Sequence, residues 1–331
     1  MSAPVLEVSD LHVTFKSPDG LVQAVRGVSF TVGPGEVMGI VGESGSGKSV
    51  SLLAVMGLLP GSAAVTGSIR YRGTELIGMR ESERRRLRGG KIAMIFQDPM
   101  TSLNPVLSVG FQIAEAVEVH QPGLSRDAAM AKAAEMLDVV GIPNAAERAR
   151  QFPHEFSGGM RQRAMIAMAI ANDPDVLIAD EPTTALDVTI QAQILEVLER
   201  VQDATQSAIV MITHDLGMVA GMADRITVMY AGRVAETGGV FDVFGHPRHP
   251  YTLGLLDSLP RLDEAGQERL VPITGSPPSL VHPPPACPFH PRCRFAEPVC
   301  RRDTPALRPI EGSGQQSACH FAESLAEVRA S

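Results

Sequence analysis

The octapeptide GESGSGKS, Gly42 to Ser49, matches the phosphate-binding loop pattern G-x4-G-K-[ST]. It follows the short apolar run GEVMGIVG, residues 35–42, which predicts a buried strand, and it precedes an apolar helical run that begins at Lys48. Glycines let successive backbone N–H groups turn toward a phosphate, and the following helix directs its positive end at the same anion. The octapeptide therefore predicts a P-loop nucleotide site rather than a simple glycine- and serine-rich turn.

The side chains at the end of this loop have distinct expected roles. Lys48 is expected to reach the β- and γ-phosphates of a nucleoside triphosphate, and the hydroxyl of Ser49 to ligate Mg²⁺. The predicted ATP-binding residues of the loop are Gly42, Glu43, Ser44, Gly45, Ser46, Gly47, Lys48, Ser49 and Val50.

A second polar group follows the apolar run VLIADEP, residues 176–182. A strand that ends at Asp180 places this carboxylate at the carboxyl edge of a sheet, where ligands bind in open α/β folds. We expect Asp180 to hold Mg²⁺ and Glu181 to orient or deprotonate the attacking water. Alternatively, Asp180 and Glu181 could be a pair of charges at a helix N-terminus. The phosphate loop in the same chain favours the role in nucleotide binding.

Three further residues are candidates on weaker signals. His214 ends the apolar run SAIVMITHD and could contact the γ-phosphate, although a strand-end histidine can also be structural. Gln97 ends a predicted strand, residues 91–97, and could sense Mg²⁺ or water, or be a polar loop residue. Phe15 could stack on adenine or belong to the core.

The pattern of apolar residues predicts a mixed α/β chain. The segments 6–15 and 24–32 alternate apolar and polar residues, which indicates half-buried strands. Residues 98–171 space their apolar residues as helices do. The strand–helix–strand order of residues 176–215 indicates a parallel sheet covered on both faces. Proline becomes frequent after Pro247.

A second glycine-containing loop, FSGGMRQR from Phe156 to Arg163, precedes another apolar helical run. Ser157, Gly158 and Gly159 are therefore expected at a helix N-terminus that suits an anion. A protein with one nucleotide has no evident use for this second loop. We hypothesise that two subunits pair head to tail, so that each places this loop over the triphosphate held by the other.

The order of these motifs resembles the ATP-binding subunits of ABC transporters. The phosphate loop, Gln97, FSGGMRQR, VLIADE, Ala185-Leu186-Asp187 and His214 occur in that family's order, across about residues 5–256. Phe156 and Met160 depart from the commonest signature but resemble the oligopeptide and dipeptide (peptide/nickel) permease branch. HPRHPYT, residues 246–252, is similar to a His-Pro-Tyr stretch of the same branch.

The resemblance implies an α/β P-loop NTPase fold: a RecA-like core with an antiparallel β subdomain, an inserted helical subdomain and a small C-terminal cysteine-containing extension. It implies an ATPase domain over 5–256, with the helical subdomain at about 98–170, and an extension over 257–331. It also implies a D-loop at Asp187 and a signature loop acting on the partner's ATP, formed by Ser157, Gly158, Gly159, Met160 and Gln162.

By the same resemblance, the chain is an ATPase subunit that energises a di- or oligopeptide importer. Its implied partners are a sister ATPase subunit in a heterodimer, two transmembrane permease subunits and an extracytoplasmic solute-binding protein. Its implied location is peripheral, on the cytoplasmic face of the cell membrane. Alternatives are another solute such as nickel, an exporter cassette, or a soluble ABC ATPase of DNA repair or translation. The net charge of −8 argues against a nucleic-acid partner.

Four cysteines, all after residue 286, have the spacing Cys287-x5-Cys293-x6-Cys300-x18-Cys319. Four thiolates suit tetrahedral zinc or an iron–sulfur cluster, and His290 or His320 could replace a cysteine. The C-x2–4-C pairs usual for zinc are absent. The resemblance favours a [4Fe–4S] cluster, with zinc and metal-free thiols as alternatives.

Overall fold

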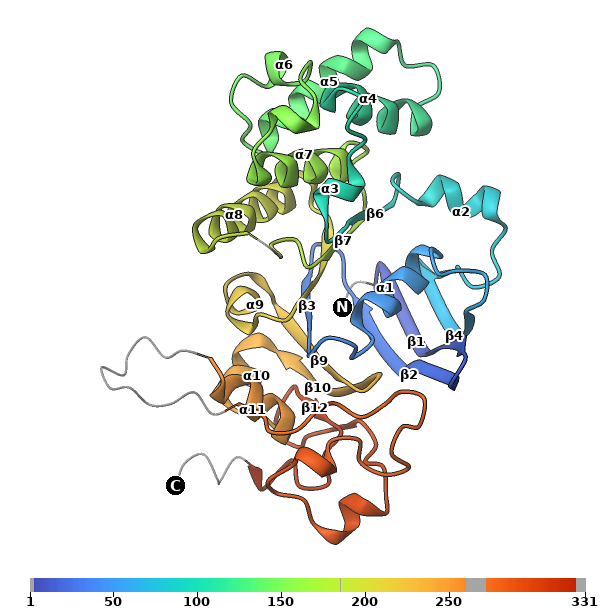
Figure 1. The fold of residues 1–331 in the computed structure, drawn as a ribbon, viewed down its shortest axis with the longest axis vertical. Coiled ribbons are helices and arrows are strands. Elements are labelled where there is room, and N and C mark those ends of the chain that lie inside the picture. Colours follow the sequence, from blue (N-terminus) through green and yellow to red (C-terminus); the bar gives the residue numbers. More distant parts are fainter. Residues whose placement is uncertain (1–2, 185, 260–271, 326–331) are drawn as a thin grey trace, which may run out of the picture. The chain divides into compact units, whose positions relative to one another are not determined.

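A computed structural model describes residues 3–184, 186–259 and 272–325, in two compact units (Figure 1). Unit 1 comprises residues 1–6, 31–37 and 71–212, and unit 2 comprises residues 7–30, 38–70 and 213–331. Each unit is therefore assembled from segments that are far apart in the sequence.

Unit 1 contains three neighbouring parallel strands in the order β8-β7-β6. These are β6 (Ile92–Ile95), β7 (Val176–Asp180) and β8 (Ala208–Thr213), and every residue in them is buried. The register pairs Ile95 with Ala179 and Asp180 with Ile212. The parallel sheet predicted from the continuous apolar runs is confirmed, and its geometry places Asp180 at a carboxyl end.

Helices make up most of the remainder of unit 1. Helix α5 packs on α4, α6 and α7, and α7 also packs on β6, α3 and α8 (Figure 1). The helical character predicted for residues 98–171 is confirmed. The elements are β5 (Thr74–Glu75), α2 (Glu81–Leu87), α3 (Pro99–Ser102), α4 (Val109–His120), α5 (Arg126–Val139), α6 (Ala145–Arg148), the 3-10 helix η1 (Pro153–Glu155), α7 (Gly158–Ile170) and α8 (Val188–Thr205).

Five helices of unit 1 begin at a serine or aspartate that caps them: Asp98 caps α3 through the N–H of Met100, and four others share one pattern. In these four the side-chain oxygen accepts a hydrogen bond from the backbone N–H three residues later, which satisfies one of the donors left over at a helix start. The caps are Ser108 for α4, Ser125 for α5, Ser157 for α7 and Asp187 for α8. The starts of α7 and α8 are thus fixed by residues that the sequence also marks as functional.

Unit 2 contains the strands β11-β12-β10-β9-β3 in this order. Strands β3 (Val37–Val41) and β9 (Arg225–Tyr230) are parallel, whereas β9 and β10 (Arg233–Gly239) are antiparallel. Near the C-terminus, β12 (Gln316–Ser317) pairs antiparallel with both β10 and β11 (Arg308–Pro309). The C-terminal region therefore continues the sheet of unit 2.

A second sheet of unit 2 holds β2 (Gly20–Val32), β1 (Leu6–Ser17) and β4 (Ala64–Tyr71) in this order. The two strands predicted for residues 6–15 and 24–32 are confirmed, and both extend beyond the predicted bounds. The helices of unit 2 are α1 (Lys48–Met56), α9 (Leu216–Met222), α10 (Val240–Gly245) and α11 (Pro250–Asp257), with the 3-10 helices η2 (His290–Arg292) and η3 (Pro298–Arg301).

The C-terminal part of unit 2 has a small apolar core of its own. It is built from Leu253, Ile310, Cys319, Ala322 and Leu325. Because Leu253 belongs to α11, this core joins that helix to the cysteine-containing segment. Across the described ranges, no helix combines the length and the apolar character that a membrane crossing requires.

Helix α4 offers a matched test of packing in unit 1. Ile113 is fully buried, whereas Val119 on the same helix is 69% exposed. Ile113→Ala leaves a cavity and is expected to lower the free energy of unfolding by about 2–5 kcal/mol. Urea denaturation followed by circular dichroism measures the loss. Val119→Ala is the control, and equal losses in the two variants would contradict the packing described here.

Candidate active site

The phosphate loop lies in unit 2 between β3 and α1, and its conformation requires glycine at two positions. Gly42 has φ of 150°, and a Cβ atom there would stand 2.2 Å from the carbonyl oxygen of Met229. Gly47 has φ of 99°, and a Cβ atom there would stand 2.5 Å from the carbonyl oxygen of Ala24. The chain can turn at this point only because side chains are absent.

Lys48 is folded back over this loop. Its Nζ donates hydrogen bonds to the carbonyl oxygens of Gly42, at 2.7 Å, and Glu43, at 3.0 Å. The lysine side chain is therefore placed beside the loop backbone, and the residue is 5% exposed. Ser44 and Gly45 lie at the exposed tip, Ser46 is buried, and the first turn of α1 includes Ser49 and Val50.

A second group of predicted residues comes together in unit 1, where β7 ends. Gln97 Nε2 and Thr184 Oγ1 both donate to Glu181 Oε2, at 3.0 and 2.7 Å. The backbone N–H of Glu181 donates to the carbonyl oxygen of Ile212 at 2.9 Å. Asp180, immediately before it, is 7% exposed. Gln97 lies two residues beyond the end of β6, so the expectation that it ends the strand is wrong by two residues.

Glu181 has a left-handed backbone conformation, with φ of 47°. This conformation costs a non-glycine residue roughly 1–2 kcal/mol, and such residues cluster where side-chain direction matters. The hydrogen bonds that the carboxylate accepts from Gln97 and Thr184, and the one that the N–H of Glu181 donates to Ile212, offset this cost. They fix the carboxylate at the edge of the sheet.

The FSGGMRQR segment forms the start of α7. Ser157 Oγ accepts from the N–H of Met160 at 3.3 Å, and both Ser157 and Gly158 are exposed. A Cβ atom on Gly158 would meet nothing closer than 3.9 Å, so the turn is open on that side. Gln162, one turn further along, is only 2% exposed. The predicted helix N-terminus is confirmed, with Gln162 beneath its surface.

The remaining predicted residues have these positions. Asp187 is the exposed N-cap of α8, where its Oδ1 accepts from Ile190 N–H at 3.0 Å. His214 is exposed just after β8, and Phe15 is half-buried on β1. Ala185, the first residue of the motif Ala185-Leu186-Asp187, lies outside the described residues. Unit 2 carries Phe15, His214 and the phosphate loop, and unit 1 carries the others.

Sequence reasoning missed three residues that contact these groups. Thr184 touches Glu181, as described above. Tyr251 Oη accepts from the backbone N–H of Glu43 at 2.8 Å, and Arg292 donates to both carboxylate oxygens of Glu43, at 2.7 and 2.9 Å. Tyr251 stands in the His-Pro-Tyr stretch, but no spacing in the sequence indicates that Arg292 reaches a residue 249 positions away.

A buried carboxylate holds the His-Pro-Tyr turn. Glu236, with no exposed surface, accepts hydrogen bonds from Arg248 N–H at 2.7 Å and His249 N–H at 3.0 Å. Gln315 Nε2 also donates to it, at 3.3 Å. Burial raises the pKa of Glu236 to about 7, although the N–H donors of Arg248 and His249 oppose the shift. Burial lowers the pKa of His249 to about 4, so its neutral ring caps α11 by accepting from Tyr251 N–H.

The four cysteines line one small chamber of about 20 Å³, together with His249, His290 and His320. Burial raises the pKa of Cys293 to about 11 and that of Cys319 to about 12, and the neighbouring thiols add to both shifts. Among the residues that the structure describes, no group of three or more His, Cys, Asp or Glu side chains is arranged to hold a metal ion.

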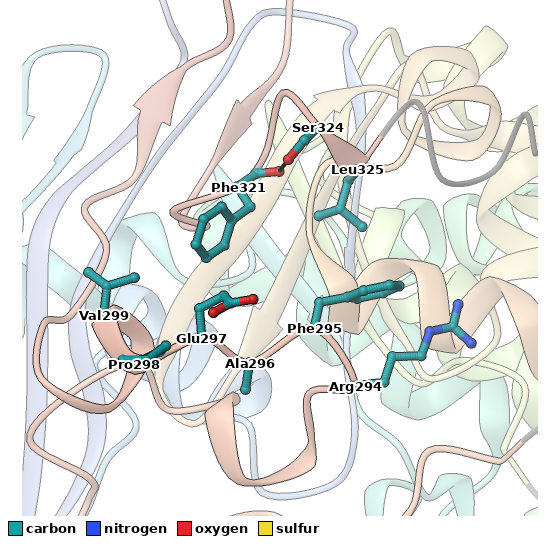
Figure 2. Close-up of a pocket in the computed structure, with 9 residues that line it drawn as sticks. All are labelled: Arg294, Phe295, Ala296, Glu297, Pro298, Val299, Phe321, Ser324 and Leu325. Atoms are coloured by element: carbon teal, nitrogen blue, oxygen red, sulfur yellow. Dashed lines mark hydrogen bonds between the residues drawn. The ribbon is translucent and has the colours of Figure 1, made fainter.

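An open groove of about 610 Å³ runs along the outside of this region (Figure 2). Phe295, Phe321 and Leu325 line both the groove and the cysteine chamber. These three apolar side chains therefore separate the thiols from the groove. The remaining groove residues are Arg294, Ala296, Glu297, Pro298, Val299 and Ser324.

The fold and the phosphate loop define a P-loop nucleotide-binding protein, and comparisons with known proteins define the family. A family model described as "ABC transporter" matches residues 25–184. A second, described as "Oligopeptide/dipeptide transporter, C-terminal region", matches residues 235–300.

Curated relatives agree with these models. The dipeptide transport ATP-binding protein DppD of Bacillus subtilis is 53% identical, over 98% of this chain and 96% of its own length. The oligopeptide transport ATP-binding protein OppD of Haemophilus influenzae is 52% identical, over 90% of this chain and 92% of its own length. OppD of Mycobacterium tuberculosis is 56% identical over 96% of this chain, which spans only 52% of that relative.

A solved ATP-binding cassette, dimeric in a post-hydrolysis state with ADP and Pi, superposes with a TM-score of 0.64. It is 26% identical, and the match covers 71% of this chain and 98% of the cassette. The chain belongs to the ABC transporter family, in the branch of the oligopeptide and dipeptide transport ATP-binding proteins. The ABC-type P-loop fold expected from the sequence is confirmed.

The buried Glu236 predicts a pH dependence of stability. Its pKa is about 7 in the fold and about 4.3 in an unfolded chain. Between these values the folded protein binds the extra proton, so the free energy of unfolding falls as pH rises. The loss is on the order of 3 kcal/mol and is complete above pH 7.

Glu236→Gln cannot titrate and should remove this part of the slope. Urea denaturation between pH 4.5 and 7.5 measures the contribution of Glu236 to the pH dependence, as the difference in unfolding free energy between wild type and variant at each pH. Glu311→Gln changes an exposed glutamate of the same C-terminal region and is the control. A constant difference between wild type and Glu236→Gln across this range would show that Glu236 is charged in the fold.

Proposed function

We propose that this chain binds and hydrolyses ATP with Mg²⁺ and that hydrolysis energises a di- or oligopeptide importer. Family membership supports the general activity. The observation that carries the catalytic part is the Glu181 carboxylate at the end of β7, held by Gln97 and Thr184. A carboxylate oriented in this way is suited to position and deprotonate a water molecule.

The phosphate loop binds the triphosphate in this proposal. Its backbone N–H groups and the start of α1 face the β-phosphate, and Lys48 contributes its charge to the β- and γ-phosphates. Glu43, Ser44, Gly45, Ser46 and Val50 take part through the backbone. Phe15 is half-exposed on β1, as a residue that stacks on adenine needs to be.

Ser49, Gln97 and Asp180 supply hydroxyl, amide and carboxylate oxygens, which are the ligands that Mg²⁺ prefers. This donor set fits the ion, which supplies charge neutralisation to the phosphates when bound. In this proposal Glu181 orients the water that attacks the γ-phosphate, and His214 contacts the γ-phosphate.

We propose that the second loop acts on a partner's nucleotide. Ser157 and Gly158 are exposed at the start of α7, and Asp187 is exposed at the start of α8. The remaining residues of this loop are Gly159 and Met160, both half-buried in the first turn of α7, and the buried Gln162. The solved cassette with ADP and Pi is dimeric, which supports pairing with a second ATPase subunit. We propose that this second subunit is a sister subunit in a heterodimer, as the resemblance to the permease branch implies.

The names of the relatives support the rest of the assembly. We propose two transmembrane permease subunits and an extracytoplasmic solute-binding protein as partners, and a peripheral position on the cytoplasmic face of the membrane. In this proposal residues 5–256 form the ATPase domain, with the helical subdomain near 98–170, and residues 257–331 form the extension. Nucleic acid has no part in it.

Glu181→Gln tests this proposal. The amide cannot accept the proton from water, so kcat for ATP hydrolysis by the assembled transporter should fall by about 10²- to 10⁴-fold while ATP binding persists. The ATP-loaded variant should accumulate paired with its partner subunit, and uptake of labelled peptides by cells should stop. Glu196→Gln, an exposed site on α8, is the control. Unchanged hydrolysis in Glu181→Gln would refute the role of Glu181, and peptide export by wild-type cells would refute import.

We propose further that Cys287, Cys293, Cys300 and Cys319 hold a [4Fe–4S] cluster. The support is that all four thiols line one chamber behind Phe295, Phe321 and Leu325. A single zinc ion holds its sulfurs about 3.8 Å apart, given Zn–S bonds of about 2.3 Å. As they lie among the described residues, the four thiols are not arranged to hold a metal ion, so side chains must move for zinc and for a cluster alike. The chamber of about 20 Å³ must widen to admit the cluster, and binding releases the thiol protons.

Anaerobic purification tests the cluster. The expected result is about four iron and four sulfide per chain, lost on replacement of Cys293 by Ser. Ser324→Ala, which changes a serine on the outer groove, is the control and should keep the iron. Stoichiometric zinc without iron, or neither metal in protein purified without oxygen, would overturn the cluster.

A further inference from the structure

The phosphate loop of this chain contains a negative charge at its second position, Glu43. The loop must receive a triphosphate, and a carboxylate on the same loop repels that anion unless its charge is neutralised. The Glu43 side chain is 27% exposed, so water screens it only in part. The neutralising partner lies in the C-terminal extension.

Arg292 forms a two-pronged ion pair with Glu43. Its Nη1 donates to Oε2 at 2.7 Å and its Nη2 donates to Oε1 at 2.9 Å. This parallel arrangement fixes both direction and distance, which a lysine could not do. The Arg292 side chain is only 5% exposed, so the pair is much less screened than a surface pair.

Arg292 is itself held in place by the extension. Its Nε donates to the carbonyl oxygen of Thr274 at 3.0 Å, and its Nη2 donates to that of Ile273 at 3.3 Å. Its Nη1 reaches Tyr230 Oη at 3.3 Å, and the guanidinium carbon lies 5.8 Å from the centre of that ring. The guanidinium is therefore oriented by groups other than Glu43.

The main chain of Glu43 is held from the same side. Tyr251 Oη accepts its N–H at 2.8 Å. Tyr251 packs on Tyr230 and Phe289, with ring centres 4.6 and 5.4 Å apart. Both the backbone and the side chain of Glu43 are thus fixed by residues that follow β9 in the sequence.

We propose that Arg292 is a positioning residue for the phosphate loop, which neutralises Glu43 and holds the loop ready for nucleotide. The C-terminal extension then sets the affinity of the loop for ATP. This inference rests on the proposed binding of ATP. A purely structural role is the alternative, in which Arg292 only fastens the extension through Ile273 and Thr274.

Titration of the purified protein with a fluorescent ATP analogue and Mg²⁺ tests the inference. Arg292→Ala leaves Glu43 charged and unpaired beside the phosphates, and the dissociation constant should rise on the order of tenfold, the factor that corresponds to about 1.4 kcal/mol. In steady-state hydrolysis by the assembled transporter, KM for ATP should rise while kcat stays within about twofold, because no group at Glu181 has changed.

Removal of the unpaired charge distinguishes the two roles. The double variant Arg292→Ala with Glu43→Gln should recover most of the lost affinity, because no carboxylate remains to repel the nucleotide. A structural role of Arg292 predicts no recovery of affinity in the double variant, because that variant still lacks the contacts of Arg292 to Ile273 and Thr274. Arg294→Ala is the matched control, because it breaks a different ion pair of the extension, the one with Asp257. This variant should bind the nucleotide with wild-type affinity.

If Arg292→Ala does not fold, variants of Glu43 test the same inference and leave the extension unchanged. Glu43→Asp keeps the charge but shortens the side chain away from Arg292, so it should bind more weakly than Glu43→Gln. Any of three results would overturn the inference. These are wild-type affinity for ATP in Arg292→Ala, no recovery of affinity in the double variant, and tighter binding by Glu43→Asp than by Glu43→Gln. If the wild type itself binds no nucleotide, the proposed function fails instead.

Discussion

The phosphate loop between β3 and α1 depends on glycine at its first and sixth positions, Gly42 and Gly47, and the nucleotide site depends on this loop. Carbonyl oxygens of Met229 and Ala24 occupy the space that Cβ atoms on Gly42 and Gly47 would need. These carbonyls belong to distant segments of unit 2, so the loop is held by its surroundings and not by its own sequence alone. Such close packing gives the backbone N–H groups one fixed direction, which an anion site requires.

The carboxylate group in unit 1 is fixed by a different means. Glu181 has an unfavourable backbone conformation, and the hydrogen bonds to Gln97 Nε2, Thr184 Oγ1 and Ile212 O hold it there. A strained residue persists only where neighbouring contacts determine its position. Each unit thus fixes polar groups at the end of a strand. Unit 2 does so with closely packed glycines, and unit 1 does so with hydrogen bonds to Glu181.

The C-terminal region is part of unit 2 and not a separate appendage. Strand β12 pairs with β10, Gln315 contacts the buried Glu236, and Leu253 of α11 shares an apolar core with Cys319. These contacts bring Tyr251 and Arg292 to the phosphate loop. A segment too short for a large core can thus still position a residue precisely, because the sheet of unit 2 provides the rigid base.

The sequence by itself determined the elements and the chemistry that is local in the chain. The phosphate loop, the buried strands β7 and β8, and the helix start at Ser157 follow from patterns of fewer than twenty residues, which periodicity and capping preferences describe well. Only the tertiary structure placed Gln97 and Thr184 on Glu181, gathered four cysteines around one chamber, and joined Arg292 to Glu43. Those contacts link residues up to 249 positions apart, and no local preference encodes which distant side chain will lie opposite.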